Sequence, residues 1–380
     1  MTQINNTYTY DVLGRLTRVK DSKSAVSADY TYDSNSNLTS AEFASGVTES
    51  YSYNAGNLVT TGGAVKGSTA LTQFQYTYDL AGRQNGVTDL NGTTASYGYD
   101  SKGQLISDVR TGGQGYNKAY TYDPKGNRVS LTDGGSATAY TYNAANRLQN
   151  SVKSNVTTAY TYDANGNTLM SQVGSDAATV YTYDLDNQLT GISGEDLTAS
   201  YTYYPNGLRK TKTVDGVTTT YAWDGDQLVY EAATATYKYI RGLSLIASVK
   251  GTTDTYYLHD GHGNVVGMTN SSGTLKKTYE YDAFGNQLTL DPTDTNPFRY
   301  CGEYWDPETG TCYLRARYYD SALGRFTQQD TYLGDYKIPL SLNYYIYCYN
   351  DPIEYRDESG NIPVETVLDL TWKEDNDTVR

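Results

Sequence analysis

The sequence is poor in the side chains that normally build a protein core. Leu, Ile, Val and Phe make up 65 of 380 residues, about 17%, which is below the roughly 20% under which disorder is suspected. The high charge density that accompanies disorder is missing, because the net charge is −14 over 380 residues. Instead the chain has 42 tyrosines, whose rings bury a large apolar area while their hydroxyls need partners. We therefore expect a folded protein with a tyrosine-rich core.

Other absences exclude several classes of protein. No run of 18 apolar residues is present, so no membrane span is predicted. The first residues, MTQINNTYTYD, have neither the basic flank nor the apolar stretch of a signal peptide. The acidic balance, without a cluster of Lys and Arg, argues against a nucleic-acid partner. Three cysteines, Cys301, Cys312 and Cys348, do not make a disulfide scaffold; the odd number favours packed thiols, with a Cys301–Cys312 bridge as the alternative.

A Tyr-x-Tyr unit followed by a polar residue recurs through the first two thirds of the chain. Successive units lie 20 to 25 residues apart, which suits two short strands and two turns. The second aromatic residues of the units are Tyr10, Tyr32, Tyr53, Tyr78, Tyr99, Tyr122, Tyr142, Tyr162, Tyr183, Tyr203 and Trp223. Eleven such units predict about 22 strands, and an open sheet of more than about ten strands curls or splits. We expect an all-β fold in which tandem hairpins wind into a curved or spiral shell.

The unit from Ala159 to Asp176, AYTYDANGNTLMSQVGSD, shows the local pattern. Tyr160 and Tyr162 are two residues apart, so in a strand they point to the same face. Asp163 opens a turn by bonding its own backbone, and Gly166 supplies the positive φ that such turns need. Tyrosines are therefore expected to line one face of the shell, either as a dry core or as the wall of a cavity.

Three polar patterns resemble parts of metal or cofactor sites, but none of them is predicted to be one. Asp163-x-Asn165-x-Asn167 begins like a calcium loop, but the glycine and the later glutamate of such a loop are missing. His259 and His262 flank Asp260, yet no further zinc-ligand pattern accompanies them. The glycine-rich stretches follow neither Rossmann nor P-loop spacing. All three read as turns.

The repeats resemble a known family. YTYDVLGRL, YTYDLAGRQ and YTYDPKGNRV resemble RHS repeats, also called YD repeats, and the stretch from Tyr256 to Asn286 is similar to the family's last repeats. From Asn296 the chain reads NPFRYCGEYWDPETGTCYLRARYYDSALGRFTQQDTY and later NYYIYCYNDPIEYRDESG, which resembles the RHS repeat-associated core. On this resemblance residues 1–290 are repeats, 291–361 are the core and 362–380 are a short acidic C-terminal tail. The tail is too short to be a folded toxin.

The resemblance implies a hollow β-shell whose end is closed by the core as a plug. RHS proteins enclose a variable C-terminal toxin and serve in bacterial competition, in insecticidal toxin complexes or at the cell wall. The expected partners are therefore the chain's own C-terminal segment or an effector toxin, together with other toxin-complex subunits, an immunity protein or cell-surface glycan. Secretion or display at the cell surface is likewise implied by the resemblance alone.

In many family members the core is an intramolecular aspartyl protease that cuts the chain just after the core motif. The motifs RYYD and GRFxxxD place the candidate catalytic residues at Arg317, Asp320 and Asp330, and the cut between Asn361 and Ile362. Two close carboxylates do not both ionise readily, so one keeps a proton while the other acts as a base on water. An arginine can polarise the scissile carbonyl.

The cleavage segment, Asp357 to Asn361, departs from the family's DPxGL pattern. Glu358 replaces proline and Asn361 replaces leucine. An alternative interpretation is that the arginine and aspartates form a structural ion pair and a turn. The chain would then be a non-enzymatic surface or wall-associated repeat protein that binds glycan or protein partners, because tyrosine-rich faces can stack on sugars. A third interpretation is a remnant without a present role.

Overall fold

The protein is built around a single antiparallel meander of 27 strands. The structure, a computed structural model, describes residues 5–22 and 25–365. Each strand of the meander pairs with the next one along the chain. The predicted tail, 362–380, lies outside the described residues except for its first four.

The strands of the meander are β1 (Asn6–Tyr10), β2 (Leu16–Asp21), β3 (Ser27–Tyr32), β4 (Leu38–Phe43), β5 (Val47–Tyr53), β6 (Val59–Lys66), β7 (Thr69–Tyr78), β8 (Gln84–Asp89), β9 (Thr94–Tyr99), β10 (Leu105–Thr111), β11 (Tyr116–Tyr122), β12 (Arg128–Asp133), β13 (Ser136–Tyr142), β14 (Leu148–Lys153), β15 (Val156–Tyr162), β16 (Thr168–Val173), β17 (Thr179–Tyr183), β18 (Leu189–Ser193), β19 (Thr198–Tyr203), β20 (Arg209–Val214), β21 (Val217–Asp224), β22 (Gln227–Ala232), β23 (Thr236–Arg241), β24 (Leu245–Lys250), β25 (Thr253–His259), β26 (Val265–Asn270) and β27 (Leu275–Thr278). The eleven predicted units account for β1–β22, and five further strands extend the sheet.

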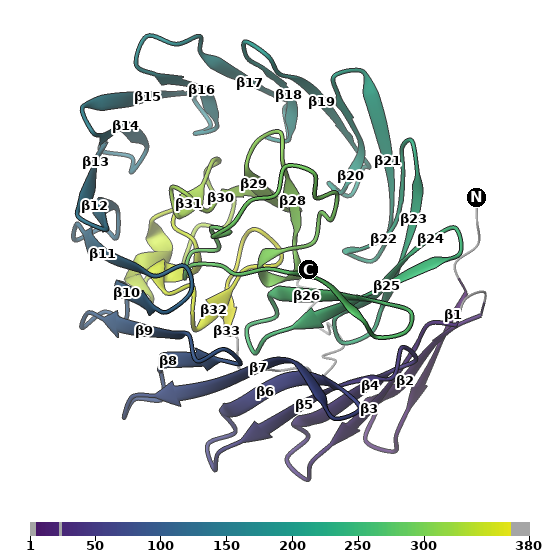
Figure 1. Ribbon diagram of the computed structural model, residues 1–380. Helices are drawn as coiled ribbons and strands as arrows, with labels where there is room; N and C mark the ends of the chain where they lie inside the picture. Colours follow the sequence, from purple (N-terminus) through teal and green to yellow (C-terminus); the bar gives the residue numbers. More distant parts are fainter. Residues whose placement is uncertain (1–4, 23–24, 366–380) are drawn as a thin grey trace.

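The meander winds round a central space as a spiral shell, which confirms the predicted all-β architecture (Figure 1). Its last strands pack against its first ones rather than pairing with them. Val19 and Tyr30, near the start, share a buried apolar cluster with Ile246 and Tyr256, near the end. Among the described residues, β1 and β27 each pair with a single neighbour, β2 and β26. The shell is therefore held closed by contacts of side chains, which include an ion pair between Lys238 and Asp21 at 2.7 Å, and not by strand pairing.

A bulge recurs at the second aromatic residue of every unit. The register of each hairpin shifts at that residue, from Tyr10 in the first unit to Trp223 in the eleventh. The next residue closes the turn: Asp163 Oδ1, for example, accepts the backbone N–H of Asn167 at 2.8 Å. Gly166, in the same turn, has a φ of +87°, which other residues adopt only with strain. The turn interpretation of this polar stretch is confirmed.

The bulged aromatic residues connect successive hairpins. The hydroxyl of Tyr32 donates to the carbonyl oxygen of Leu16, which lies opposite the bulged Tyr10 of the preceding unit. The same bond, at 2.6 to 2.8 Å, is made by Tyr53, Tyr78, Tyr99, Tyr122, Tyr142 and Tyr203, and by the indole N–H of Trp223. Each bond satisfies a carbonyl at the bulge of the neighbouring hairpin and contributes about 1 kcal/mol.

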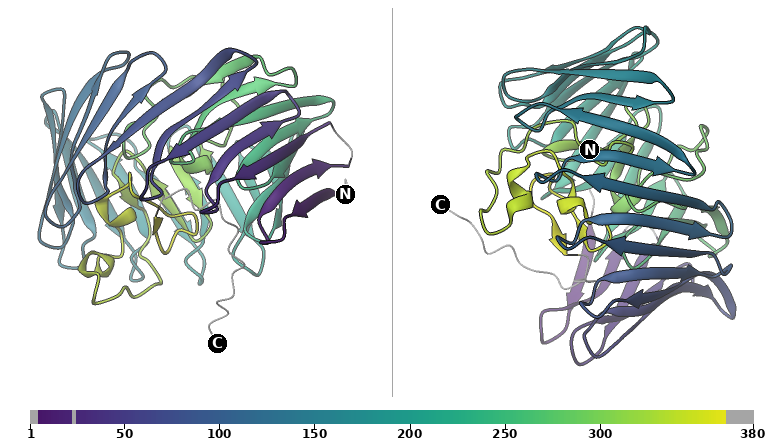
Figure 2. Two further views of the ribbon diagram at one scale, coloured as in Figure 1. Left: turned by 90° about the horizontal axis from the view of Figure 1, so that it is seen from below. Right: turned by 90° about the vertical axis from the view of Figure 1, so that its left-hand side faces the viewer.

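Residues 296–365 lie inside the shell and toward one of its ends (Figures 1 and 2). We call residues 296–365 the interior segment. It contains a four-stranded sheet, a two-stranded sheet and three short 3₁₀ helices. These elements are η1 (Tyr300–Gly302), β28 (Tyr304–Asp306), β29 (Thr311–Leu314), β30 (Arg317–Asp320), β31 (Arg325–Phe326), η2 (Pro339–Leu342), η3 (Cys348–Asn350), β32 (Tyr355–Arg356) and β33 (Val364–Glu365).

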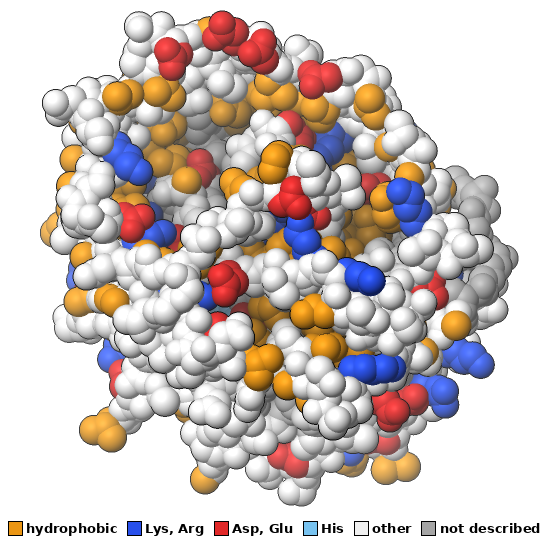
Figure 3. Space-filling view, viewed as in Figure 1, with side chains coloured by type: hydrophobic (Ala, Val, Ile, Leu, Met, Phe, Trp, Pro, Cys, Tyr) orange, Lys and Arg blue, Asp and Glu red, His pale blue; other side chains and the backbone are white. Residues whose placement is uncertain are grey.

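The inner tyrosine face is dry in some parts of the shell and hollow in others. Tyr201 packs with Tyr313 and Tyr318 of the interior segment. Tyr221 and Tyr239 pack with other aromatic residues of the same segment. Elsewhere a cavity of about 210 Å³ remains between β7–β9 and β26, and hollows separate wall and interior segment in Figure 3. The sequence left open whether the tyrosine face is a dry core or the wall of a cavity, and both occur in different parts of the shell.

The three cysteines are free, and Cys312 and Cys348 are buried. These two thiols lie in an aromatic cluster of the interior segment, as the prediction of packed thiols required. No disulfide joins Cys301 to Cys312. Within the described part of the chain, no helix is long and apolar enough to span a membrane.

Candidate functional site

Arg317 is the centre of a buried polar site in the interior segment. It is the first residue of β30, directly after the turn of the β29–β30 hairpin, and it pairs with Leu314 across that hairpin. Its side chain is almost fully buried, and its guanidinium carbon lies 3.6 Å from the ring centroid of Phe326. Burial lowers the pKa of Arg317 to about 10, which leaves it charged at neutral pH.

Each part of the Arg317 guanidinium has a partner. One terminal nitrogen lies 2.5 Å from Asp330 Oδ2 and 3.8 Å from Asp357 Oδ2. The other donates to the carbonyl oxygen of Tyr344 at 2.9 Å. The Nε–H donates to the carbonyl oxygen of Gly360, the residue before the predicted cleavage position. A single arginine thus joins two carboxylates to the backbone of the predicted cleavage segment.

The two carboxylates of the site favour their protonated forms more than usual. Burial raises the pKa of Asp330 to about 6, against the opposing effect of Arg317. Burial also raises the pKa of Asp357. Asp330 additionally accepts the backbone N–H of Tyr332 at 2.8 Å. One carboxyl group in the site can therefore exchange a proton close to neutral pH.

Asp357 shapes the chain around the predicted cut. Its Oδ1 accepts the backbone N–H groups of Gly360 at 2.8 Å and of Asn361 at 3.2 Å. The hydroxyl of Ser359 donates to the same oxygen at 3.0 Å, and the carbonyl of Ser359 accepts the N–H of Ala316 at 3.2 Å. The segment is consequently held as a compact turn against β30. A cavity of about 340 Å³ borders this turn and gives water access to it.

The structure brings Arg317 and Asp330 together but places Asp320 elsewhere. Asp320 Oδ1 accepts the backbone N–H of Leu323 at 3.0 Å, and the cations that act on it are Arg128 and Arg325. Asp357 is the second carboxylate beside Arg317, and the sequence analysis missed it as a site residue. A signal was present, because Asp357 opens the segment that was identified as the cleavage sequence.

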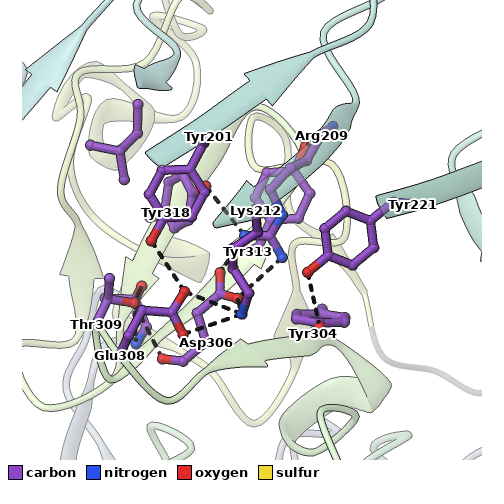
Figure 4. A network of polar contacts seen from close by, with 12 residues as sticks. Tyr201, Arg209, Lys212, Tyr221, Tyr304, Asp306, Glu308, Thr309, Tyr313 and Tyr318 are labelled. Atoms are coloured by element: carbon purple, nitrogen blue, oxygen red, sulfur yellow. Dashed lines mark hydrogen bonds and ion pairs between the residues drawn. The ribbon is translucent and has the colours of Figure 1, made fainter. Parts of the chain in front are cut away.

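A second ionic cluster joins the shell to the interior segment (Figure 4). Asp306, at the end of β28, lies 2.5 Å from Arg209 and 2.7 Å from Lys212, both on β20. Lys212 also contacts Glu308 at 3.1 Å. Tyrosine rings surround the cluster, and Arg209 lies over that of Tyr313 at 4.3 Å. This cluster positions the β28–β31 sheet, and with it Arg317, relative to the wall.

Comparison with known proteins agrees with this architecture. The family model described as "Teneurin YD-shell" matches residues 2–112, 83–177 and 240–353. The chain belongs to the teneurin YD-shell family. The matched residues include most of the repeats and the part of the interior segment that carries Arg317 and Asp330.

This YD-shell chain resembles much longer proteins. It is 33% identical over 368 residues to the tRNA3(Ser)-specific nuclease WapA of Bacillus spizizenii. The matched region is 94% of this chain and 16% of that protein. It is also 33% identical over 371 residues to the tRNA nuclease WapA of Bacillus subtilis (strain 168), with the same coverage. The YD-shell chain therefore spans about a sixth of the length of these relatives.

Two solved structures share the fold of the YD-shell chain. The crystal structure of TcdB2-TccC3-TEV superposes with a TM-score of 0.74 at 18% identity, over 94% of this chain and 21% of that chain. The Tc holotoxin pore of Photorhabdus luminescens superposes with a TM-score of 0.75 at 17% identity, over 94% of this chain and 20% of that chain. At these identities the likeness concerns the fold.

The histidines of the YD-shell are packed side chains. Burial lowers the pKa of both His259 and His262 to about 4, so both rings are neutral at physiological pH. Asp260 accepts the backbone N–H groups of His262 and Asn264, each at 2.9 Å, as the turn interpretation predicted. Within residues 5–22 and 25–365, no group of three His, Cys, Asp or Glu side chains is arranged to hold a metal ion.

Proposed function

We propose that the chain is the shell portion of a secreted or cell-surface bacterial toxin protein, which encloses a C-terminal segment and frees it by cutting its own chain. The observation that carries this proposal is the contact between Arg317 and the carbonyl of Gly360, beside Asp330 and Asp357. The names of the relatives, tRNA nucleases and a Tc holotoxin pore, support a role in toxin proteins. The proposed partner is the enclosed segment or an effector toxin, with toxin-complex subunits and an immunity protein as further partners.

The proposed reaction is hydrolysis of the chain after Asn361. A buried pair of acids around one arginine can divide the roles of general acid and general base, because the arginine favours charge on one of them. Asp330, in contact with Arg317, is assigned as the base that activates a water from the adjoining cavity. Asp357, whose pKa is raised by burial, is assigned as the acid.

Asp320 has a structural role in this proposal. It closes the turn after β30 through the N–H of Leu323, so its loss should weaken that turn without touching the reacting groups. Arg317 has two roles: it holds the charge of Asp330, and it orients the peptide plane next to the cut. Because the substrate is part of the same chain, its effective concentration is high and modest chemical activation is sufficient.

The test is the intact mass of the purified chain beside that of Asp330→Asn. We expect the unaltered chain to be shortened to residues 1–361, and the variant to keep the full mass. Asp184→Asn is the matched control, because Asn54 and Asn143 occupy the same turn position in other repeats. It should be cut like the unaltered chain. Full-length mass for every protein would contradict the proposal and favour a passive shell.

A second candidate function is the binding of glycan, and one cavity favours it. The space of about 210 Å³ is lined by tyrosines together with Asp89, Arg110 and Glu280. Aromatic faces with charged neighbours suit a sugar ring and its hydroxyls. Titration of the uncut chain with oligosaccharides, followed by tyrosine fluorescence, would support this function if saturable binding is lost in a Tyr97→Ala variant.

A further inference from the structure

Asn361 places a reactive side chain at the cut itself. In the amide orientation that satisfies both of its terminal atoms, Nδ2 donates to Asp330 Oδ1 at 3.1 Å and to the carbonyl oxygen of Gly360 at 3.2 Å. The backbone N–H of Asn361 is held by Asp357 at 3.2 Å. The amide nitrogen is therefore next to a carboxylate that can accept its proton.

The bond on the other side of Asn361 also has a proton route. The backbone N–H of Ile362 donates to Ser359 Oγ at 3.3 Å. That hydroxyl donates in turn to Asp357 Oδ1 at 3.0 Å. A leaving amine at Ile362 would thus be formed within reach of Ser359 and, through it, of Asp357.

We propose that Asn361 itself cuts the chain, by cyclisation of its side chain rather than by hydrolysis. Nδ2 loses a proton to Asp330 and attacks the carbonyl carbon of Asn361, and a five-membered ring closes. The bond from that carbon to the nitrogen of Ile362 then breaks, and the leaving nitrogen takes up the hydroxyl proton of Ser359, which turns away from Asp357 Oδ1. The proton that Asp330 received passes back to the Ser359 oxygen through water of the adjoining cavity, so that both groups are restored. The products are an N-terminal fragment that ends in a succinimide and a C-terminal fragment that starts with the free amine of Ile362.

This inference rests on the proposed function, since it gives a different chemistry to the same cut. It explains why an asparagine can stand at the cleavage position. Ring closure within one residue benefits from proximity more than an attack by free water does. A nucleophile activated by a neighbouring base is the general form of such reactions. Asp330 is the base in both chemistries, so its substitution does not separate them.

The experiment is the intact mass of both fragments from the unaltered chain, Asn361→Leu and Asn361→Gln. We expect the early N-terminal fragment of the unaltered chain to be lighter than a hydrolysis product by the mass of one water molecule, before the ring opens. Both variants should be cut at least about 100-fold more slowly, because leucine has no nucleophile and glutamine must close a larger ring. Asn91→Leu, on an exposed turn of the shell, is the matched control and should be cut normally.

Three results would overturn the inference, and they are distinguishable. If Asn361→Leu is cut as fast as the unaltered chain, hydrolysis is the mechanism and the proposed function stands. If the N-terminal fragment carries a free carboxylate from the earliest time point and Asn361→Gln is cut normally, the same conclusion holds. If the unaltered chain stays whole, the proposed function falls together with this inference. Thermal melting of each variant shows whether it is folded.

Discussion

Replacing Asp306 by asparagine should strongly destabilise the attachment of the interior segment to the shell. Asp306 is completely buried, and its partner Arg209 has a side chain only 1% exposed. Arg209 and Lys212 hold the pKa of Asp306 below its usual range despite its burial. Asparagine keeps the shape of the side chain and removes its charge. Two cations would then face the single carboxylate of Glu308 in a site closed to water.

The expected loss is about 3–5 kcal/mol in the free energy of unfolding, the usual effect of leaving a buried charge without its partner. Asp29→Asn is the matched control. Its partner Arg18 lies 3.4 Å away, but both side chains are about half exposed. Exposed pairs contribute about 0–1 kcal/mol, so this variant should be nearly neutral. The two substitutions are chemically identical and differ only in burial.

Urea unfolding at pH 7, followed by tyrosine fluorescence, measures both variants. Midpoints are compared at a common m value, so that a change in midpoint reports a change in stability. The reasoning is refuted if Asp306→Asn lies within about 1 kcal/mol of Asp29→Asn. In that case the cluster would be hydrated, and the tyrosine packing alone would hold the interior segment in place.

Two further predictions concern buried groups. Burial raises the pKa of Glu49 to about 7, so between pH 4.5 and about 7 the folded state binds more protons than the unfolded state, and stability falls as the pH rises. The free energy of unfolding of Glu49→Gln, taken relative to that of the unaltered chain, should therefore be about 2–3 kcal/mol higher at pH 8 than at pH 5 when both are measured by urea unfolding. The same relative stability at the two pH values would contradict this. Gly166 and Gly103 have φ of +87° and +84°, but only at Gly166 would a Cβ meet Tyr345 and Gln329 of the interior segment. Gly103→Ala should lower the free energy of unfolding by about 1–2 kcal/mol, and Gly166→Ala should lower it by about 1–3 kcal/mol more. Equal losses would show that the interior segment shifts to make room for the added methyl group.

The local part of the fold was predictable because it repeats. Residues two apart in a strand share a face, and an aspartate before a glycine makes a turn, so the strands β1–β22 followed from the spacing alone. The bonds between units were not predictable. The hydroxyl of Tyr32 reaches the carbonyl oxygen of Leu16 only because a bulge frees that carbonyl and the next hairpin lies beside it. The sequence of a single unit predicts neither the bulge nor the position of the next hairpin.

The site was predictable only in part, for a similar reason. Arg317 and Asp330 meet, as the motifs suggested. Asp320 does not join them, because residues three apart in a strand point to opposite faces, a test that the sequence already allowed. Asp357 joins Arg317 through a turn that returns the chain from 40 residues farther on. Such a return depends on the packing of the whole interior segment, which no local pattern encodes.

The open seam of the shell has a consequence for how such proteins can change in length. In a barrel closed by hydrogen bonds, one added hairpin alters the tilt and stagger of every strand. Here β1 and β27 are not paired to each other within the described residues, and each hairpin of the meander shares backbone ladders only with the hairpins next to it in the sheet. Duplication or loss of one twenty-residue unit would lengthen or shorten the spiral while the other hairpins keep their register. The volume that the shell encloses can thus evolve by gene duplication, one repeat at a time.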